Sequence, residues 1–454
     1  MTARFEAPKG TYDYLPPLAA QRAAVAELML EQARLAGYQR IETPIFEDTT
    51  LFARGVGEST DVVQKEMYTF TDKGGRSLTL RPELTAGVLR ALIEHNRVGP
   101  AAGLVKVACY GPQFRYERPQ AGRQRQFSQV DIEAIGSADP AVDADVILVG
   151  EEIFRQLGAE VTLLLTSLGD ATCRPAYREQ LLGFLRGLGD RLPAEARARA
   201  EQNPLRVLDM KDPAVQELTA GAPLLRDSLC DACKAYHEQV CELLAAAGVK
   251  WVEAPRLVRG LDYYVRTTFE WQAEGMDAAQ NALGGGGRYD GLAELLGGPP
   301  APGIGWALGV DRTMLALERA GRLPDVPESL AVLVVPLASD DAAGGRARTG
   351  STAPAGGQAH PPASPRAVAL TLVRDLRRAG IAADLPYAER PLRRHLQAAA
   401  KRGARAVVIL GADELAAGQA SVRDMTAHDQ ARVPLAAVTA EVRRILTTDP
   451  GAAT

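Results

Sequence analysis

The sequence predicts an α+β domain over residues 1–325, built on one mainly antiparallel sheet, and a small α/β domain over residues 329–446. In the first part, long strand-like segments mix with helical patterns, which favours an antiparallel sheet over a doubly wound parallel one. After Ser329 the pattern alternates as β-α-β-α-β, which is typical of an α/β domain. A length of 454 residues agrees with two or three domains.

The composition is that of a globular protein, with 46% hydrophobic and 24% charged residues. The first residues lack an apolar signal core and no run of about 18 apolar residues occurs, so we expect a cytoplasmic protein without a membrane segment. Five cysteines in a chain of this length do not indicate a disulfide framework. A net charge of −4 argues against a protein coated in nucleic acid, although local basic patches remain compatible with it.

The first helices and strands are predicted from hydrophobic periodicity and from the positions of glycine and proline. Residues 18–36 predict an amphipathic helix that ends at Gly37. "RIETPIF" (40–46) predicts a short strand, and Pro44 favours an edge or a subunit boundary because proline cannot donate to a ladder. "SLTLRPELTAGVLRALIEH" (77–95) predicts a strand, a turn and a helix with Pro82 at its first position.

Residues 103–117 and 125–136 predict two strands joined by a turn around which four arginines gather. On the second strand, Gln129, Asp131 and Glu133 share one face. Half-exposed sheets with a polar face are common. However, these faces carry Arg and Glu rather than Lys, and planar guanidinium groups suit phosphates and carboxylates. The pattern therefore favours a binding surface.

Helical patterns at 139–157 and a strand at 161–169 come next, and residues 170–250 then predict an inserted helical subdomain with five proline breaks. Within it, Cys230, Cys233, His237 and Cys241 are spaced by 3, 4 and 4 residues. That spacing predicts one stripe of a single helix, which cannot surround an ion tetrahedrally. We therefore prefer a buried stripe to a zinc site.

The segment 259–271 predicts a strand whose faces differ. Its apolar face would hold Leu261, Tyr263, Val265, Thr267, Phe269 and Trp271, and its polar face Asp262, Tyr264, Arg266, Thr268 and Glu270. The following glycine-rich stretches, 284–288 and 303–309, match neither a Walker loop nor a dinucleotide fingerprint. Close backbone packing explains them better, and each brings an arginine near the sheet, Arg288 and Arg312.

The C-terminal part predicts helices at 366–379 and 391–402 between strands. Residues 366–405 contain ten Lys/Arg and three Asp/Glu, a local charge of +7, which indicates either solvated helix faces or a nucleic-acid contact. Residues 339–365 are rich in Gly, Pro, Ser and Ala and predict a disordered insertion.

Taken together, these motifs resemble those of the histidyl-tRNA synthetase family of class II aminoacyl-tRNA synthetases. "GYQRIETPIFE" (37–47), "FRYERPQAGRQRQFSQVDIEAIG" (114–136) and "GIGWALGVDR" (303–312) look like the three motifs of the class. "RGLDYY" (259–264) and "GGGRYDGL" (285–292) are similar to the motifs that mark the histidine enzyme. The resemblance covers nearly the full chain, with 170–250 similar to the helical insertion and 329–446 similar to the anticodon-binding domain.

The resemblance implies ATP-dependent ligation of histidine to tRNA(His) through a histidyl-adenylate, with Mg²⁺, in a homodimer that pairs through residues 38–50. It implies catalytic roles for Arg115 at the α-phosphate, Arg259 opposite it and Arg312 at the terminal phosphates. The residues it implies at ATP are Arg115, Glu117, Arg123 and Arg312. The residues it implies at histidine are Glu83, Thr85 and Gln129 for the amino group, Glu133 and Tyr264 for the imidazole, and Tyr263 beside them.

Two departures from the family pattern stand out. Leu84 replaces the glycine usual between Glu83 and Thr85, and the insertion holds fewer cysteines than that of many bacterial relatives. With Cys173 nearly isolated, no metal site is expected. An alternative is the histidine-sensing regulatory paralogue of ATP phosphoribosyltransferase, which shares the fold but typically lacks the anticodon domain and the arginine motifs. A purely structural or tRNA-binding module would leave the polar faces of Glu133 and Tyr264 unexplained.

Overall fold

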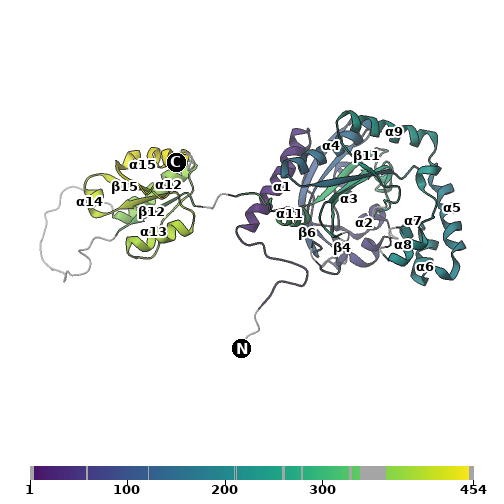
Figure 1. Ribbon diagram of the computed structural model, residues 1–454, viewed down its shortest axis with the longest axis horizontal. Helices are drawn as coiled ribbons and strands as arrows, with labels where there is room; N and C mark the ends of the chain where they lie inside the picture. Colours follow the sequence, from purple (N-terminus) through teal and green to yellow (C-terminus); the bar gives the residue numbers. More distant parts are fainter. Residues whose placement is uncertain are drawn as a thin grey trace. The chain divides into compact units, whose positions relative to one another are not determined.

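A computed structural model describes residues 5–57, 60–120, 122–208, 210, 212–257, 261–277, 280–326, 330–337 and 364–448. The chain forms two compact units, Met1–Asp325 and Val326–Thr454, each with its own core (Figure 1). Among the described helices, none is both long and apolar enough to cross a membrane.

The larger unit is organised around an eight-stranded sheet. Its strands, in spatial order, are β1 (Gln39–Arg40), β5 (Val105–Phe114), β6 (Gln126–Ile135), β11 (Gly303–Gly309), β10 (Ala282–Arg288), β9 (Val265–Ala273), β7 (Val161–Ser167) and β8 (Val252–Glu253). Only the edge pairs β1–β5 and β7–β8 are parallel among these strands, which confirms the predicted antiparallel character.

One face of this sheet is apolar and covered by helices. The covering helices are α1 (Leu18–Leu35), α4 (Pro140–Leu157), α9 (Asp231–Ala246) and α11 (Val310–Arg319). Val130 and Ile132 of β6 and Trp271 of β9 are buried there, and Gly150 of α4 provides room because a Cβ at that position would lie 2.3 Å from the Trp271 ring. The other face is divided: Val107 and Cys109 of β5 pack there in a second core with α3 and the insertion, and the polar side chains of β6 share that face.

The predicted strand 40–46 is wrong. Its two ends belong to different sheets: β1 ends at Arg40, and β2 (Phe46–Asp48) joins β3 (Tyr68–Thr71) and β4 (Ser77–Leu80) in a small three-stranded sheet. Pro44 lies in the segment between them. The two sheets are tied by Arg81, which is buried and donates from Nη1 to Thr43 O at 2.9 Å and from Nε to Pro112 O at 3.0 Å.

The remaining short elements of this unit lie near the small sheet. They are α2 (Thr49–Val56), a π-helical turn at Val62–Glu66, α3 (Thr85–Glu94) and α10 (Leu292–Leu295). The prediction that Pro82 begins a helix is also wrong, because α3 begins at Thr85. The intervening Glu83 takes up the first amide groups of the helix, as described below.

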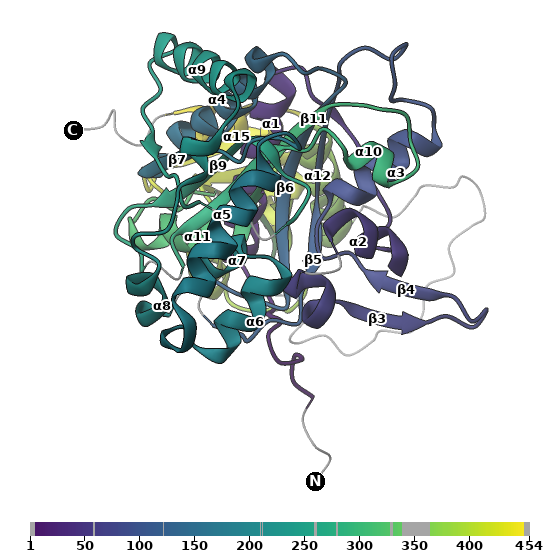
Figure 2. The same ribbon diagram turned by 90° about the vertical axis from the view of Figure 1, so that its right-hand side faces the viewer.

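The insertion consists of short helices, α5 (Arg174–Gly187), α6 (Ala194–Gln202), α7 (Leu205–Leu208) and α8 (Pro213–Leu218), which lie together on one side of the unit (Figure 2). Four of the prolines that predicted breaks lie at helix starts: Pro175 and Pro213 lie in first turns, and Pro193 and Pro204 precede α6 and α7. Proline fits there because the first helical N–H groups have no intrahelical acceptor.

The smaller unit has a five-stranded sheet. Its strands, in spatial order, are β13 (Ala383–Asp384), β12 (Val332–Pro336), β14 (Ala406–Leu410), β15 (Gln419–Asp424) and β16 (Gln430–Pro434). The first three are parallel, as the β-α-β-α-β pattern predicts, and the last two add an antiparallel edge. The helices are α12 (Pro365–Arg378), α13 (Leu392–Lys401), α14 (Ala412–Ala416) and α15 (Val438–Thr447).

The predicted disordered insertion at 339–365 lies outside the described residues except at its end. There Ser364 caps α12, its Oγ accepting from Ala367 N at 3.3 Å, and Pro365 is the first helical residue.

Candidate functional site

A cavity of about 220 Å³ opens on the polar face of the eight-stranded sheet. It is walled by β6, β9, β10 and β11, by the start of α3 and by α11. The predicted site residues that line it are Glu83, Thr85, Arg115, Glu117, Arg123, Gln129, Glu133, Tyr263, Tyr264 and Arg312. Arg259, which the family pattern also predicts, lies outside the described residues.

A buried carboxyl group forms the floor of the cavity. Glu133 on β6 exposes 2% of its surface and accepts a hydrogen bond from the hydroxyl of Tyr289. Burial raises the pKa of Glu133 to about 8, against the opposing effect of hydrogen bonds from Tyr289 and Thr85. The carboxyl group is therefore poised to gain or lose a proton near neutral pH when a polar ligand arrives.

The glycines of β10 and β11 allow this carboxyl group to fit, as the prediction of close packing requires. A Cβ on Gly305 would lie 1.9 Å from Glu133 Oε2, and a Cβ on Gly286 would lie 1.9 Å from Gly305 O. Strand pairing sets Gly305 directly opposite Glu133. The absence of side chains on these glycines therefore leaves the space that the Glu133 side chain occupies beside the cavity.

Glu83 lies beside the cavity and also completes a helix. Its carboxylate oxygens accept from Thr85 N at 2.8 Å and Ala86 N at 2.9 Å, the first amide groups of α3. Burial raises the pKa of Glu83, while these two amides oppose that shift. A carboxyl group at a helix N-terminus is stabilised as the anion, and the anion is the form that binds a cation.

Two further buried polar atoms in the cavity are available to a ligand. Gln129 Oε1 and Asp131 Oδ1 are buried and have no hydrogen-bond partner among the described residues. Burial raises the pKa of Asp131 well above its usual value, and the neighbouring Glu133 and Glu83 add to the shift. A buried acceptor without a donor costs stability unless a ligand supplies one. Strand parity places Asp131 on the same face of β6 as Gln129 and Glu133, so the sequence pattern alone could have indicated this residue.

The two tyrosines of "RGLDYY" both line the cavity, contrary to the alternation predicted for 259–271. β9 begins only at Val265, and the backbone of Arg266 has φ +49°, where a register shift interrupts the pairing with β10. Tyr263 and Tyr264 therefore lie in a turn, with ring centroids 4.6 Å apart. Alternation is valid only inside a regular strand.

From Phe269 onward the predicted parity of this strand is confirmed. Phe269 and Trp271 are buried in the helix-covered core, while Glu270 between them lines the cavity. Arg266, predicted on the polar face, points elsewhere: its guanidinium lies 4.8 Å from the ring centroid of Tyr236 and 3.5 Å from Asp170 Oδ2.

The cavity lining is also rich in guanidinium groups. Arg312 donates to Gly122 O at 2.9 Å and Ala282 O at 2.8 Å, and Arg115 donates from Nε to Pro82 O at 2.8 Å. Arg123 pairs with Glu117 at 3.4 Å. Burial lowers the pKa of Arg312, and the positive charges of Arg123 and Arg115 lower it further. Cations held this close favour the arrival of an anion.

Arg288, the other arginine delivered by a glycine-rich stretch, is not part of the cavity. It is fully buried, forms an ion pair with Asp143 of α4 and donates from Nη1 to Ser137 O at 3.0 Å and Asp290 Oδ1 at 2.9 Å. Its partners lie on α4 and in nearby loops, so its function is to join the sheet to that helix. Tyr289, the next residue, is the site residue that sequence reasoning missed in this motif.

The family models and the relatives that match this chain agree with one another. A family model described as histidyl-tRNA synthetase matches residues 10–313, and one described as anticodon binding domain matches residues 332–445. The histidine--tRNA ligase of Nocardia farcinica is 52% identical over 443 residues, covering 97% of this chain and 98% of the relative. That of Streptomyces coelicolor is 50% identical over 439 residues, covering 96% of this chain and 97% of the relative.

A solved structure is also similar. The apo structure of S. aureus histidyl-tRNA synthetase superposes with a TM-score of 0.78 at 34% identity, covering 97% of this chain and 100% of that one. The likeness therefore extends over both compact units of the chain.

Proposed function

The chain belongs to the histidyl-tRNA synthetase family, and we infer that it attaches histidine to its cognate tRNA at the expense of ATP. The regulatory paralogue is less well supported, because relatives about half identical over the full length are histidine--tRNA ligases and an anticodon-binding model matches the second unit. The observation that best supports the reaction is that one cavity is lined both by buried carboxyl groups and by several guanidinium groups.

The buried carboxyl groups of the cavity suit the positively charged amino group and the imidazole of histidine. We assign the imidazole to Glu133 and Tyr264, one contact for each ring nitrogen, with Tyr263 beside them and Tyr289 holding Glu133 in place. We assign the amino group to Glu83, Thr85 and Gln129. A pocket that hydrogen-bonds both nitrogens rejects side chains that cannot pair with it by roughly 10⁴-fold, because its buried groups would stay unsatisfied.

The guanidinium groups of the cavity suit the phosphates of ATP. In the first step a carboxylate oxygen of histidine attacks the α-phosphorus, the bond to the bridging oxygen breaks, and pyrophosphate leaves with the electron pair. Arg115 and Arg259 would stabilise charge at the α-phosphate and Arg312 at the terminal phosphates, with Glu117 and Arg123 also facing ATP. Positioning and electrostatics of this kind supply most of the acceleration in phosphoryl transfer.

In the second step the terminal ribose hydroxyl of tRNA attacks the carbonyl carbon of the adenylate. An ester forms, the hydroxyl proton is released, and AMP leaves. Mg²⁺ prefers oxygen ligands, and the cavity offers the carboxylates of Glu117 and Glu270. These two residues would hold the ion together with phosphate oxygens. When bound, it would supply positive charge against the pyrophosphate.

The second unit carries a surface that suits RNA. Around the start of α13, Arg390, Arg393 and Arg394 are exposed, and Tyr387 exposes 72% of its surface nearby in sequence. Exposed rings stack on bases and guanidinium groups bind phosphates. These features support contact with tRNA near the anticodon.

The prediction of a homodimer through residues 38–50 is supported by an exposed apolar patch. Ile45, Phe46 and Phe70 expose 44%, 51% and 43% of their surface, and the two phenylalanine rings meet edge to face at 6.2 Å. Such a patch marks an interaction surface. Sedimentation of the protein tests the dimer, and a cytoplasmic location follows from the proposed reaction.

Exchange of labelled pyrophosphate into ATP tests the reaction itself. We expect exchange with histidine and with none of the other amino acids. Exchange supported by a different amino acid, or no exchange with any, would contradict the proposed function.

A further inference from the structure

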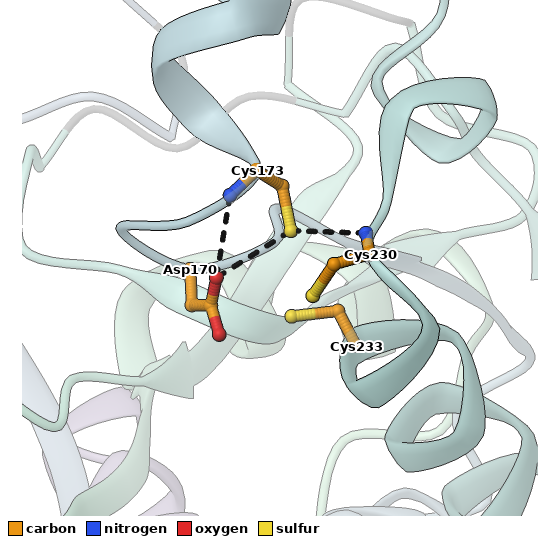
Figure 3. Close-up of side chains that lie close together, drawn as sticks. All are labelled: Asp170, Cys173, Cys230 and Cys233. Atoms are coloured by element: carbon orange, nitrogen blue, oxygen red, sulfur yellow. Dashed lines mark hydrogen bonds between the residues drawn. The ribbon is translucent and has the colours of Figure 1, made fainter.

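Four potential metal ligands meet at the base of the insertion, away from the catalytic cavity. Asp170 and Cys173 follow β7, while Cys230 and Cys233 lie at the start of α9, and Figure 3 shows all four side chains turned toward one another. Their ligand atoms, three sulfurs and a carboxylate oxygen, all lie within 4.8 Å of one another. Cys173 and Cys233 are buried.

This arrangement corrects two sequence expectations. Cys173 is not isolated, because its Sγ accepts from Cys230 N at 3.2 Å across 57 residues of chain. Cys230 is the N-cap residue of α9 and not part of its helical stripe, so its side chain and that of Cys233 converge on a common point. His237 and Cys241 instead form a separate group with Glu253.

The donor set is that of a tetrahedral soft-metal site. Zinc takes thiolate, imidazole and carboxylate ligands, commonly from pairs separated by two residues, and both pairs here have that spacing. With Zn–S bonds of about 2.3 Å, ligand atoms at tetrahedral corners lie roughly 3.8 Å apart. The separations of at most 4.8 Å are therefore within about 1 Å of those that zinc needs.

Hydrogen bonds already orient the ligands. Thr172 N and the Cys173 thiol donate to Asp170 Oδ1 at 2.9 Å and 3.4 Å. Arg266 lies 3.5 Å from Asp170 Oδ2, where it would orient the carboxylate. Gly169, at φ +59°, leaves room for Cys173, since a Cβ there would lie 3.1 Å from Cys173 Cβ.

We propose that Asp170, Cys173, Cys230 and Cys233 bind one structural Zn²⁺. The two ligand pairs flank the helical insertion, so the ion closes a loop of 57 residues between Cys173 and Cys230. Closing a loop of this length restricts the unfolded chain strongly and fixes the insertion on the sheet. All four positions are taken by protein ligands, as in structural and not in catalytic zinc sites.

Metal analysis of the full-length protein tests this proposal, and it does not depend on the aminoacylation reaction. Protein purified without chelators or an affinity tag should contain one zinc per chain by mass spectrometry. Exchange for Co²⁺ should give sulfur-to-cobalt charge transfer and intense visible d–d bands. Absence of zinc together with a Co²⁺ titration that gives no charge-transfer band would overturn the proposal.

Substitutions identify the ligands. Cys173→Ser and Cys230→Ser should lose the zinc, whereas Asp170→Cys, which offers four sulfurs, should keep it and add charge-transfer intensity with Co²⁺. Cys241→Ser and Cys109→Ser are matched controls and should keep it. Loss of zinc in Cys241→Ser with retention in Cys173→Ser would assign the metal to the His237 group and overturn the proposal. If the serine variants fail to fold, the Co²⁺ spectra of the wild-type chain and of Asp170→Cys decide the question.

Discussion

The hydroxyl of Tyr289 donates a hydrogen bond to the carboxyl group of Glu133, and neither residue exposes more than 2% of its surface. Tyr289→Phe removes that donor without changing the shape of the ring. A hydrogen bond to a neutral group contributes about 0.5–1.5 kcal/mol, so we expect KM for histidine in pyrophosphate exchange to rise roughly 2- to 10-fold. Tyr177→Phe is the control, because its hydroxyl bonds Pro223 O inside the insertion. Equal KM values for the two variants would contradict the role of Tyr289.

The raised pKa of Glu133 predicts a pH-dependent stability. The folded protein holds the proton up to about pH 8, while the unfolded chain releases it near the ordinary carboxyl pKa of 4.5. Stability from this group is therefore complete below that lower value and is lost as pH rises through 8. Urea unfolding of Glu133→Gln should show a weaker fall in stability over this range than the parent. A parallel fall in both proteins would show that other groups control it.

Gly305 should tolerate no side chain. A Cβ there would lie 1.9 Å from Glu133 Oε2, so Gly305→Ala should displace the carboxyl group and abolish histidine-dependent exchange. Gly183→Ala is the matched control: it lies inside α5 with nothing within 4 Å of an added Cβ. That change should stabilise the fold by about 0.5–1 kcal/mol and leave exchange unchanged. Normal KM and kcat in Gly305→Ala would contradict the close approach.

Arg312 and Arg288 should fail in different ways. Arg312 lines the cavity and is held there by two backbone carbonyls, so Arg312→Ala should lose roughly 10²-fold or more in kcat for exchange and lose less stability than Arg288→Ala. Arg288→Ala leaves Asp143 buried without its partner and should lower the free energy of unfolding by about 3–5 kcal/mol. Calorimetry and exchange kinetics on both variants separate the two roles. A large loss of stability in Arg312→Ala would assign it a structural role instead.

Removal of the second unit should divide the two steps of the reaction. The unit ending at Asp325 has its own cores and contains every described cavity residue, so a chain that stops there should still exchange pyrophosphate. Aminoacylation of tRNA should weaken, because the exposed basic surface around α13 is lost. Comparison of the two assays on one preparation measures this, and equal loss of both activities would contradict the assignment.

Much of the fold follows from local pattern. The hairpin β5–β6, the parity of Gln129 and Glu133, and the strand running into α11 were predictable, because each is a regular element whose period alone decides which side chains are buried. The arginines of the cavity were predictable from the family resemblance and not from spacing. Arg288 and Arg312 both follow glycine-rich stretches, yet Arg288 pairs with Asp143 inside the core.

The failures share a cause. Tyr263 departs from strand parity because the backbone turns before Val265, and Cys173 meets Cys230 only because the insertion folds back on itself. Tyr289 matters through a partner 156 residues away. Periodicity reports one element at a time, whereas these contacts depend on where distant segments meet.

The first turn of the insertion contacts the cavity wall directly. Arg174, the residue after Cys173, donates from Nη1 to the backbone oxygen of Tyr264, which lines the cavity, at 2.9 Å. The insertion therefore holds part of the cavity wall in place, although it lies outside the eight-stranded sheet. A chimera that takes this segment from a relative would replace that contact, and the cavity wall at Tyr264 should shift with it.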